Sequence, residues 1–454
     1  MHSSDQGRKG KKFLYRVLAV VILLAVVFCA EYLAQRSFDE VRLSDYYNYD
    51  VKKLKKEHAD VDMIFVGASQ IYHGCNPDVI SEELGIGEVL DCAPASGQCD
   101  GDYYLLRGLL RDFSPKYVVM EIPWHKFLKK QARSIERGSL LCADRMPLAD
   151  KLDYAFHCFP LEMLPNLSAM YRFGGQIWGT SQVINNYRAK KAVAEGNWVD
   201  ESQRSYRKNG YCWFDTSSPQ GSLGMVGLGL NYFQDDLVDE REHAYMKKMV
   251  DLCREKGVEV ILVMLPSSLS EMYGVVNFQG AIDYATAFAK ECDCPYINFS
   301  YLKNREELFP DTVFSDRVHL NGEGSVTFST IFCDVLKMLQ RGEDPGGMFY
   351  TSFDEMSKEV HRIVAAGASA VRNGDGTVSI TGASLQNEDV IPEYRIVMVQ
   401  NDEVTAELCP WQESTEFTLE EAKIPDAQTA VMRLEARQKG KTDPDAYVKK
   451  IKIS

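Results

Sequence analysis

The sequence has no low-complexity tract and no internal repeat of roughly 20–50 residues, so a fibrous or solenoid architecture is not indicated. Hydrophobic residues make up 45% of the chain and charged residues 26%, which is typical of a globular protein. A length of 454 residues exceeds what one ordinary core fills. We therefore expect two domains, one of which carries a large insertion.

Positive charge is scarce outside the N-terminus. The net charge is −14, yet residues 1–16 alone carry +4, which leaves −18 on the rest of the chain. A nucleic-acid partner would require a basic surface to neutralise its phosphates. We therefore expect no nucleic acid among the partners of this protein.

The twelve cysteines form neither a disulfide framework nor a metal motif. Several lie inside apolar runs, as Cys253 and Cys333 do, where a cysteine acts as a small hydrophobic residue. Cys292 and Cys294 flank Asp293, but no second pair or histidine cluster accompanies them, so zinc is not indicated. We expect unpaired structural cysteines, and no motif calls for a metal or an organic cofactor.

Long apolar runs are absent apart from one near the N-terminus. Its uncharged part, residues 17–30, is shorter than the roughly 20 residues of a spanning helix, but flanking aromatic and basic residues can extend its reach. An uncleaved anchor, a cleaved signal peptide and a buried core helix all fit this pattern. We expect a transmembrane anchor over residues 13–34, with the basic residues 1–12 in the cytoplasm and the bulk of the chain outside.

Beyond the anchor, short apolar runs alternate with helical segments. We interpret the charged residues 35–60 as a stalk between membrane and domain. The apolar runs lie at residues 61–66, 89–90, 117–122, 258–265 and 296–299. Strands alternating with helices in this way predict an α/β domain over residues 61–342, with a parallel sheet covered by helices on both faces.

Two segments depart from this alternation. Residues 124–235 are rich in glycine and aromatic residues and read as an insertion, either a lid or substrate platform or structural padding. After residue 342, short runs of period two are separated by turns such as residues 373–376. This pattern predicts a β-sandwich over residues 350–454, an accessory domain that binds carbohydrate or only packs against the main domain.

Two motifs carry the chemistry. Ser69 follows Gly67 at the end of the first strand, where a serine is exposed and its N–H lies near a helix N-terminus. Near the end of the α/β domain, Asp316 precedes His319 by three residues, so the carboxylate can accept the imidazole Nδ1–H and leave Nε2 free for a serine. Each motif alone also fits a helix cap or an exposed histidine.

Together, Gly-x-Ser after the first strand and Asp-x-x-His-Leu-Asn-x-x-Gly before the last helix resemble the GDSL/SGNH hydrolase superfamily. The chain looks most like its membrane-anchored bacterial branch, which includes the D-alanine-transfer protein of teichoic-acid modification and polysaccharide O-acetylation proteins. The resemblance spans about residues 61–341. It implies an SGNH-like, flavodoxin-like fold with Ser69 as nucleophile, His319 as general base and Asp316 as the residue that orients the histidine.

The resemblance also implies an oxyanion hole made by the N–H groups of Ser69 and Gly97. The family's asparagine after the third strand is missing here, because that stretch reads Glu-Ile-Pro-Trp-His. Gln98, Trp124 and His125 remain candidates for a third donor. Loss of one oxyanion-hole donor typically lowers the reaction rate by ~10²–10³-fold, so the catalytic activity depends on how many donors this site supplies. His73 and His125 lie near the motif strands and are expected to be rim or packing residues.

The expected function is that of an extracytoplasmic serine-dependent O-acyl esterase or acyltransferase that works through an acyl-serine. The resemblance implies an acylated cell-surface glycan or polymer as substrate, and a membrane-bound O-acyltransferase as a partner. The alternative is a catalytically degenerate surface protein that binds glycan or such a partner.

Overall fold

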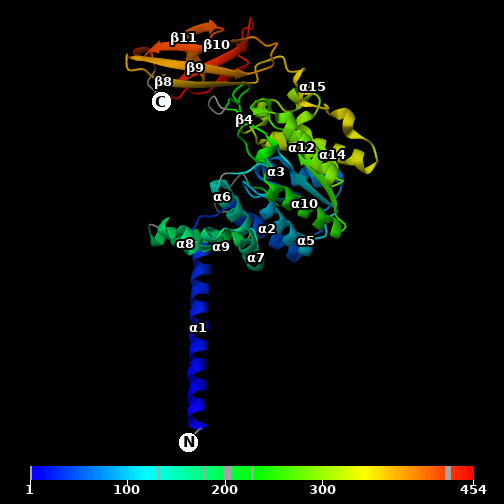
Figure 1. The fold of residues 1–454 in the computed structure, drawn as a ribbon, viewed down its shortest axis with the longest axis vertical. Coiled ribbons are helices and arrows are strands. Elements are labelled where there is room, and N and C mark those ends of the chain that lie inside the picture. The colour runs from blue at the N-terminus through cyan, green and yellow to red at the C-terminus, as the bar shows by residue number, and fades with distance from the viewer. Residues whose placement is uncertain are drawn as a thin grey trace.

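The computed structural model describes residues 3–130, 132–176, 179–197, 206–225, 230–424 and 431–453. A long helix, α1 (Ser3–Ser37), projects from one side of an α/β body, and a β-sandwich lies at the opposite end (Figure 1). Within α1, residues Lys12–Ser37 are long and apolar enough to cross a membrane, and their most apolar 18-residue window is not buried in this structure.

The body is built on a five-stranded sheet in the order β2-β1-β3-β5-β7, with all neighbouring strands parallel. The strands are β1 (Val61–Val66), β2 (Glu88–Cys92), β3 (Tyr117–Glu121), β5 (Glu259–Met264) and β7 (Tyr296–Asn298). This is the flavodoxin-like strand order, in which ligands bind outside the carboxyl ends of the strands. The α/β fold expected from the sequence is therefore present.

Alternate residues of the strands point into two hydrophobic cores, one on each face of the sheet. Met63 and Phe65 of β1 pack in one cluster with the helices α4 (Pro77–Leu84) and α14 (Gly322–Gln340). Ile64 and Val66 point into the other cluster, with α5 (Cys99–Asp112), α10 (Glu240–Glu255) and α12 (Phe278–Glu291). Burial on both faces explains why the strands read as continuous apolar runs.

The segment expected to be a stalk packs on the body instead. It forms α2 (Leu43–Glu57), in which Tyr46, Tyr47 and Leu54 are buried in the main cores while its lysines stay exposed. The stalk interpretation was wrong because the lysines of this segment lie on one exposed face, while Tyr46, Tyr47 and Leu54 lie on the buried face. An amphipathic helix of this kind is stabilised by packing its apolar stripe on a core.

The insertion is largely helical in the part of it that the structure describes. Its helices are α6 (Ala132–Ala143), α7 (Leu148–Cys158), α8 (Ala169–Phe173) and α9 (Thr180–Ala194). They are followed by an irregular segment over residues 206–225 that runs past the carboxyl edge of the sheet, where the amide of Cys212 donates to the carbonyl of Tyr72. Short elements complete the body: α3 (Ser69–Gly74), α11 (Leu269–Tyr273), α13 (Arg305–Leu308), α15 (Phe353–Ser357), and the paired strands β4 (Asn231–Tyr232) and β6 (Val275–Val276).

The C-terminal strands form two antiparallel sheets that share one apolar core. One sheet contains β12 (Glu416–Glu420), β9 (Thr377–Leu385) and β8 (Ala365–Arg372). The other contains β11 (Glu403–Gln412), β10 (Pro392–Gln400), β13 (Val431–Gln438) and β14 (Ala446–Val448). The β-sandwich expected from the sequence is present, and β8 forms although its alanine-rich sequence has little β propensity.

All twelve cysteines are free thiols, and nine of them are buried. The nine buried cysteines are thus small packing residues, as the sequence predicted.

Candidate active site

Ser69 lies at the carboxyl edge of the sheet, as the first residue of α3, just after β1. The turn that presents it is tight: a side chain at Gly67 would overlap Glu121 of the neighbouring strand β3. The amide of Ala68 donates to Glu121 Oε2 at 2.7 Å, so the turn is held to β3 by a buried carboxylate. Ser69 is therefore fixed at the strand-to-helix junction, with its N–H in the first turn of a helix, where amides lack intrahelical acceptors.

The structure brings Ser69, His319 and Asp316 together, as the motif spacing predicted. His319 Nε2 lies 2.7 Å from Ser69 Oγ. On the other side of the ring, His319 Nδ1 lies 2.7 Å from Asp316 Oδ2 and 2.9 Å from Oδ1. A serine, an imidazole and a carboxylate in one hydrogen-bonded line have the geometry of an activated nucleophile.

The Asp316 carboxylate is held as an anion. Partial burial tends to raise its pKa, but the hydrogen bond from His319 outweighs this, and the pKa of Asp316 is lowered to about 2. The amides of Val318 and His319 also donate to its Oδ1, at 2.9 and 3.0 Å. An ionised carboxylate at Nδ1 favours the tautomer that leaves Nε2 unprotonated toward Ser69.

A second histidine supports the first by stacking. The His73 ring lies between His319, at a centroid distance of 4.5 Å, and Phe214, at 3.9 Å. Burial, with a smaller contribution from the nearby His319, lowers the pKa of His73 to about 3. His73 is therefore a neutral packing residue at ordinary pH, in line with the expectation for it, and Phe214 brings the insertion into the site.

The Gly97 N–H, which the sequence resemblance assigns to the oxyanion hole, already donates a hydrogen bond within the protein. Ser96 has a positive φ of 58°, and the Gly97 N–H closes a turn onto the carbonyl of Pro94 at 3.1 Å. Gly97 itself sits close to the serine turn, because a Cβ there would lie 2.8 Å from the Gly67 carbonyl and 2.9 Å from Asp102 Oδ1. The turn would have to open for this amide to reach an oxyanion.

The three candidates for a further donor have different surroundings. The Gln98 side chain is buried and donates to the carbonyl of Ile135 at 3.1 Å. The Trp124 indole N–H donates to Glu271 Oε1 at 2.9 Å. His125 is exposed. The Gln98 amide and the Trp124 indole are thus already hydrogen-bonded elsewhere.

Glu271, on α11, is a residue that sequence reasoning missed. Its buried carboxylate binds Trp124 through one oxygen and the guanidinium of Arg317 through the other. The Arg317 carbonyl in turn accepts a hydrogen bond from Ser268 Oγ at 2.7 Å. Glutamate in the first turn of a short helix reads as an ordinary helix-start signal, so the sequence offered no sign of this contact.

No family model matches the chain, and the search of curated proteins finds no match. Among solved structures, a GDSL-like lipase from Bacteroides thetaiotaomicron VPI-5482 is similar at a TM-score of 0.29 and 11% identity, covering 64% of this chain and 99% of that one. An acetyl xylan esterase gives 0.28 and 11%, covering 62% and 99%. A gut microbial diltiazem-metabolizing enzyme gives 0.28 and 9%, covering 82% and 75%.

Proposed function

We propose that this protein is a serine-dependent O-acyl esterase or acyltransferase that works outside the cytoplasm on an acylated cell-surface glycan or polymer. The observation that carries the proposal is the hydrogen-bonded line from Ser69 through His319 to Asp316, with 2.7 Å at each junction. The line needs no cofactor to activate a hydroxyl for attack on an ester.

In the first half of the reaction, Ser69 Oγ attacks the ester carbonyl and its proton passes to His319 Nε2. A tetrahedral oxyanion forms beside the N–H of Ser69. The C–O bond to the alcohol then breaks, and His319 returns the proton to the leaving oxygen. The products of this half are an acyl-serine and a free hydroxyl.

In the second half, water or a sugar hydroxyl attacks the acyl-serine while His319 accepts its proton. Collapse of the second oxyanion returns that proton to Ser69. Water as acceptor makes the protein an esterase, and a sugar hydroxyl makes it an acyltransferase. A membrane-bound O-acyltransferase would be the natural donor of acyl groups in the second case.

The proposal is tested with the purified full-length chain and O-acetylated polysaccharide, by following acetate release or transfer by mass spectrometry. We expect turnover by the wild type and none by Ser69→Ala. For the location, a reporter that is active only outside the membrane, fused after residue 60, should be active. Activity of a cytoplasm-only reporter at that position would contradict the surface-polymer role.

A second candidate function has one observation in its favour. The Gly97 amide is bound to the Pro94 carbonyl, and the stretch after β3 lacks the family asparagine. A site short of oxyanion donors would suit a surface protein that binds glycan or an acyltransferase partner without turnover. Binding of acylated polymer with no acyl-serine in the wild type would favour this alternative.

A further inference from the structure

The insertion carries an exposed apolar stripe on α7. Leu148, Leu152 and Phe156 follow one another at four-residue spacing, so they share one face of this helix. All three are exposed, and Phe156 is 74% exposed. The opposite face holds the buried Tyr154. A helix with apolar residues on both its faces has one face without a partner in this structure.

Further exposed apolar residues lie in the next elements of the insertion. Leu161, directly after α7, is 81% exposed, and Tyr171 on α8 is 65% exposed. Met170, beside it, is also exposed. Single exposed apolar residues need no explanation, but six of them within residues 148–171, three of which share one helix face, indicate a surface that contacts something apolar.

The helices that carry these residues lie where α1 joins the body. Figure 1 shows α7, α8 and α9 gathered at the outer end of α1. Glu31 of α1 accepts hydrogen bonds from Ser168 Oγ at 2.7 Å and from the amide of Ala169 at 2.5 Å. Asn186 of α9 donates to the carbonyl of Ser37 at 3.1 Å. The end of α1 and the insertion are thus joined by specific contacts.

The length of α1 places these contacts at a membrane boundary. A hydrocarbon core about 30 Å thick takes about 20 helical residues. Counted from Phe13, the first apolar residue after the basic segment, about 20 residues end near Tyr32. The insertion therefore meets α1 at the level where lipid tails give way to head groups.

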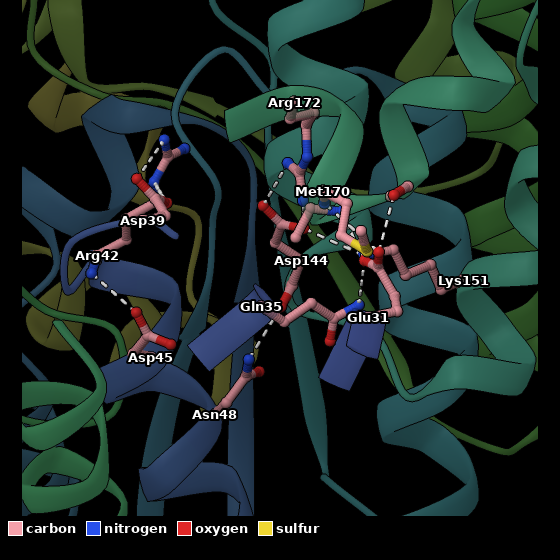
Figure 2. Close-up of polar contacts among 12 residues, drawn as sticks. Glu31, Gln35, Asp39, Arg42, Asp45, Asn48, Asp144, Lys151, Met170 and Arg172 are labelled. Carbon is pink, nitrogen blue, oxygen red and sulfur yellow. Dashed lines mark hydrogen bonds and ion pairs between the residues drawn. The ribbon is translucent and has the colours of Figure 1, made fainter. Parts of the chain in front are cut away.

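The polar groups where α1 meets the insertion are of a kind expected in the head-group region of a membrane. Between α1 and the insertion lies a cavity of about 410 Å³ lined by charged side chains (Figure 2). Arg172 binds Asp144 through two hydrogen bonds of 3.0 and 2.9 Å, and Lys151 binds the same carboxylate. Paired charges of this kind suit a hydrated head-group region beside an apolar surface that reaches the acyl boundary.

We propose that the six exposed side chains Leu148, Leu152, Phe156, Leu161, Met170 and Tyr171 form a second membrane contact. They rest in the outer lipid interface around α1, so the body is held against the bilayer at a fixed orientation. The occupant is the phospholipid bilayer itself, because Leu148 lines the same cavity as Tyr32, at the end of the apolar span of α1. Aromatic side chains with apolar neighbours are the composition that favours this interface.

The experiment uses the full-length chain in phosphatidylcholine–phosphatidylglycerol nanodiscs, with one chain per disc. The photoreactive residue p-benzoylphenylalanine replaces Phe156, Leu161 or Tyr171 in turn, and adducts are identified by mass spectrometry. Ile391 is the matched control, because it is an exposed apolar residue, 52% exposed, on the sandwich at the other end of the molecule. Circular dichroism melts confirm that each variant is folded.

We expect phospholipid adducts at the three insertion positions and no phospholipid adduct when p-benzoylphenylalanine replaces Ile391. Absence of lipid adducts from folded insertion variants would overturn the proposal. Adducts to a second protein chain, seen with several chains per disc, would assign this surface to self-association instead. The readout does not depend on catalysis, so a failed esterase assay leaves this result unaffected.

Discussion

The guanidinium of Arg317 lies against the buried carboxylate of Glu271, with Nε 3.1 Å from Oε2. Arg317 stands between Asp316 and His319 in the sequence, so this ion pair fastens the loop that carries both of them to α11. Through its other oxygen Glu271 also holds the Trp124 indole, on the loop after β3. One carboxylate therefore positions two of the loops that border Ser69.

The first prediction follows from this contact. Glu271→Gln keeps the shape of the side chain but removes the charge that holds Arg317. The loop bearing His319 should loosen, and kcat on an activated acetyl ester should fall by up to about 100-fold, because small misplacements of a catalytic group are costly. The substrate KM should change much less.

The matched control is Glu323→Gln, which removes a carboxylate from the first turn of α14. It should leave kcat near the wild-type value. An unchanged kcat in folded Glu271→Gln would show that the ion pair does not position the histidine.

The second prediction concerns the tautomer of the histidine. Asp316→Asn replaces the carboxylate that accepts from His319 Nδ1 with an amide that can donate an N–H to it. The imidazole would then carry its proton on Nε2, where it cannot accept the proton of Ser69. We expect kcat to fall by about 10⁴-fold without loss of fold. Steady-state kinetics beside a thermal melt measure both, and a loss of less than about tenfold would remove Asp316 from the mechanism.

The third prediction tests the close approach at Gly97. A methyl group there would press on the Gly67 carbonyl and on Asp102, so Gly97→Ala should shift the serine turn and lower both activity and stability, the latter by about 1–3 kcal/mol. Gly374→Ala is the control, because nothing lies within 4 Å of a Cβ at Gly374. Equal melting temperatures for the two variants would contradict the packing described here.

The fourth prediction concerns pH and His73. Its pKa falls from 6.5 to about 3 on folding, so below pH 6.5 the unfolded chain binds a proton that the folded chain does not. His73 therefore costs stability progressively as the pH falls from 6.5 toward 3, with a slope of up to about 1.4 kcal/mol per pH unit.

His73→Phe keeps a stacking ring and removes the titration. Relative to wild type, its free energy of unfolding should improve as the pH falls from 6.5 to 4, measured by urea denaturation. Parallel pH profiles for wild type and His73→Phe would mean that His73 is protonated in the folded protein.

Much of the α/β fold could be read from local pattern. Buried parallel strands show as apolar runs, and the bounds of α4 are marked in the sequence by Pro77 in its first turn and by Gly85, which ends it in a left-handed conformation. The convergence of Ser69 with His319 was also predictable, since both lie on connections that start at the carboxyl edge of the sheet, the first after β1 and the second between β7 and α14.

What the sequence could not show depends on contacts between distant segments. The packing of α2 on the body, the ion pair from Glu271 to Arg317, and the stack of Phe214 on His73 each join residues far apart in the chain. The turn in which the Gly97 N–H is hydrogen-bonded depends on the positive φ of Ser96, and a serine in the sequence does not predict a positive φ. Local pattern carries no information on such pairings.

The central claim is that Ser69 is an activated nucleophile. The most direct measurement is covalent labelling of the full-length protein with a fluorophosphonate, read by intact-mass spectrometry and peptide mapping. We predict one adduct, on Ser69, which is lost in Ser69→Ala and strongly slowed in His319→Gln. A folded wild type that takes up no label, or that is labelled equally in Ser69→Ala, would contradict the account.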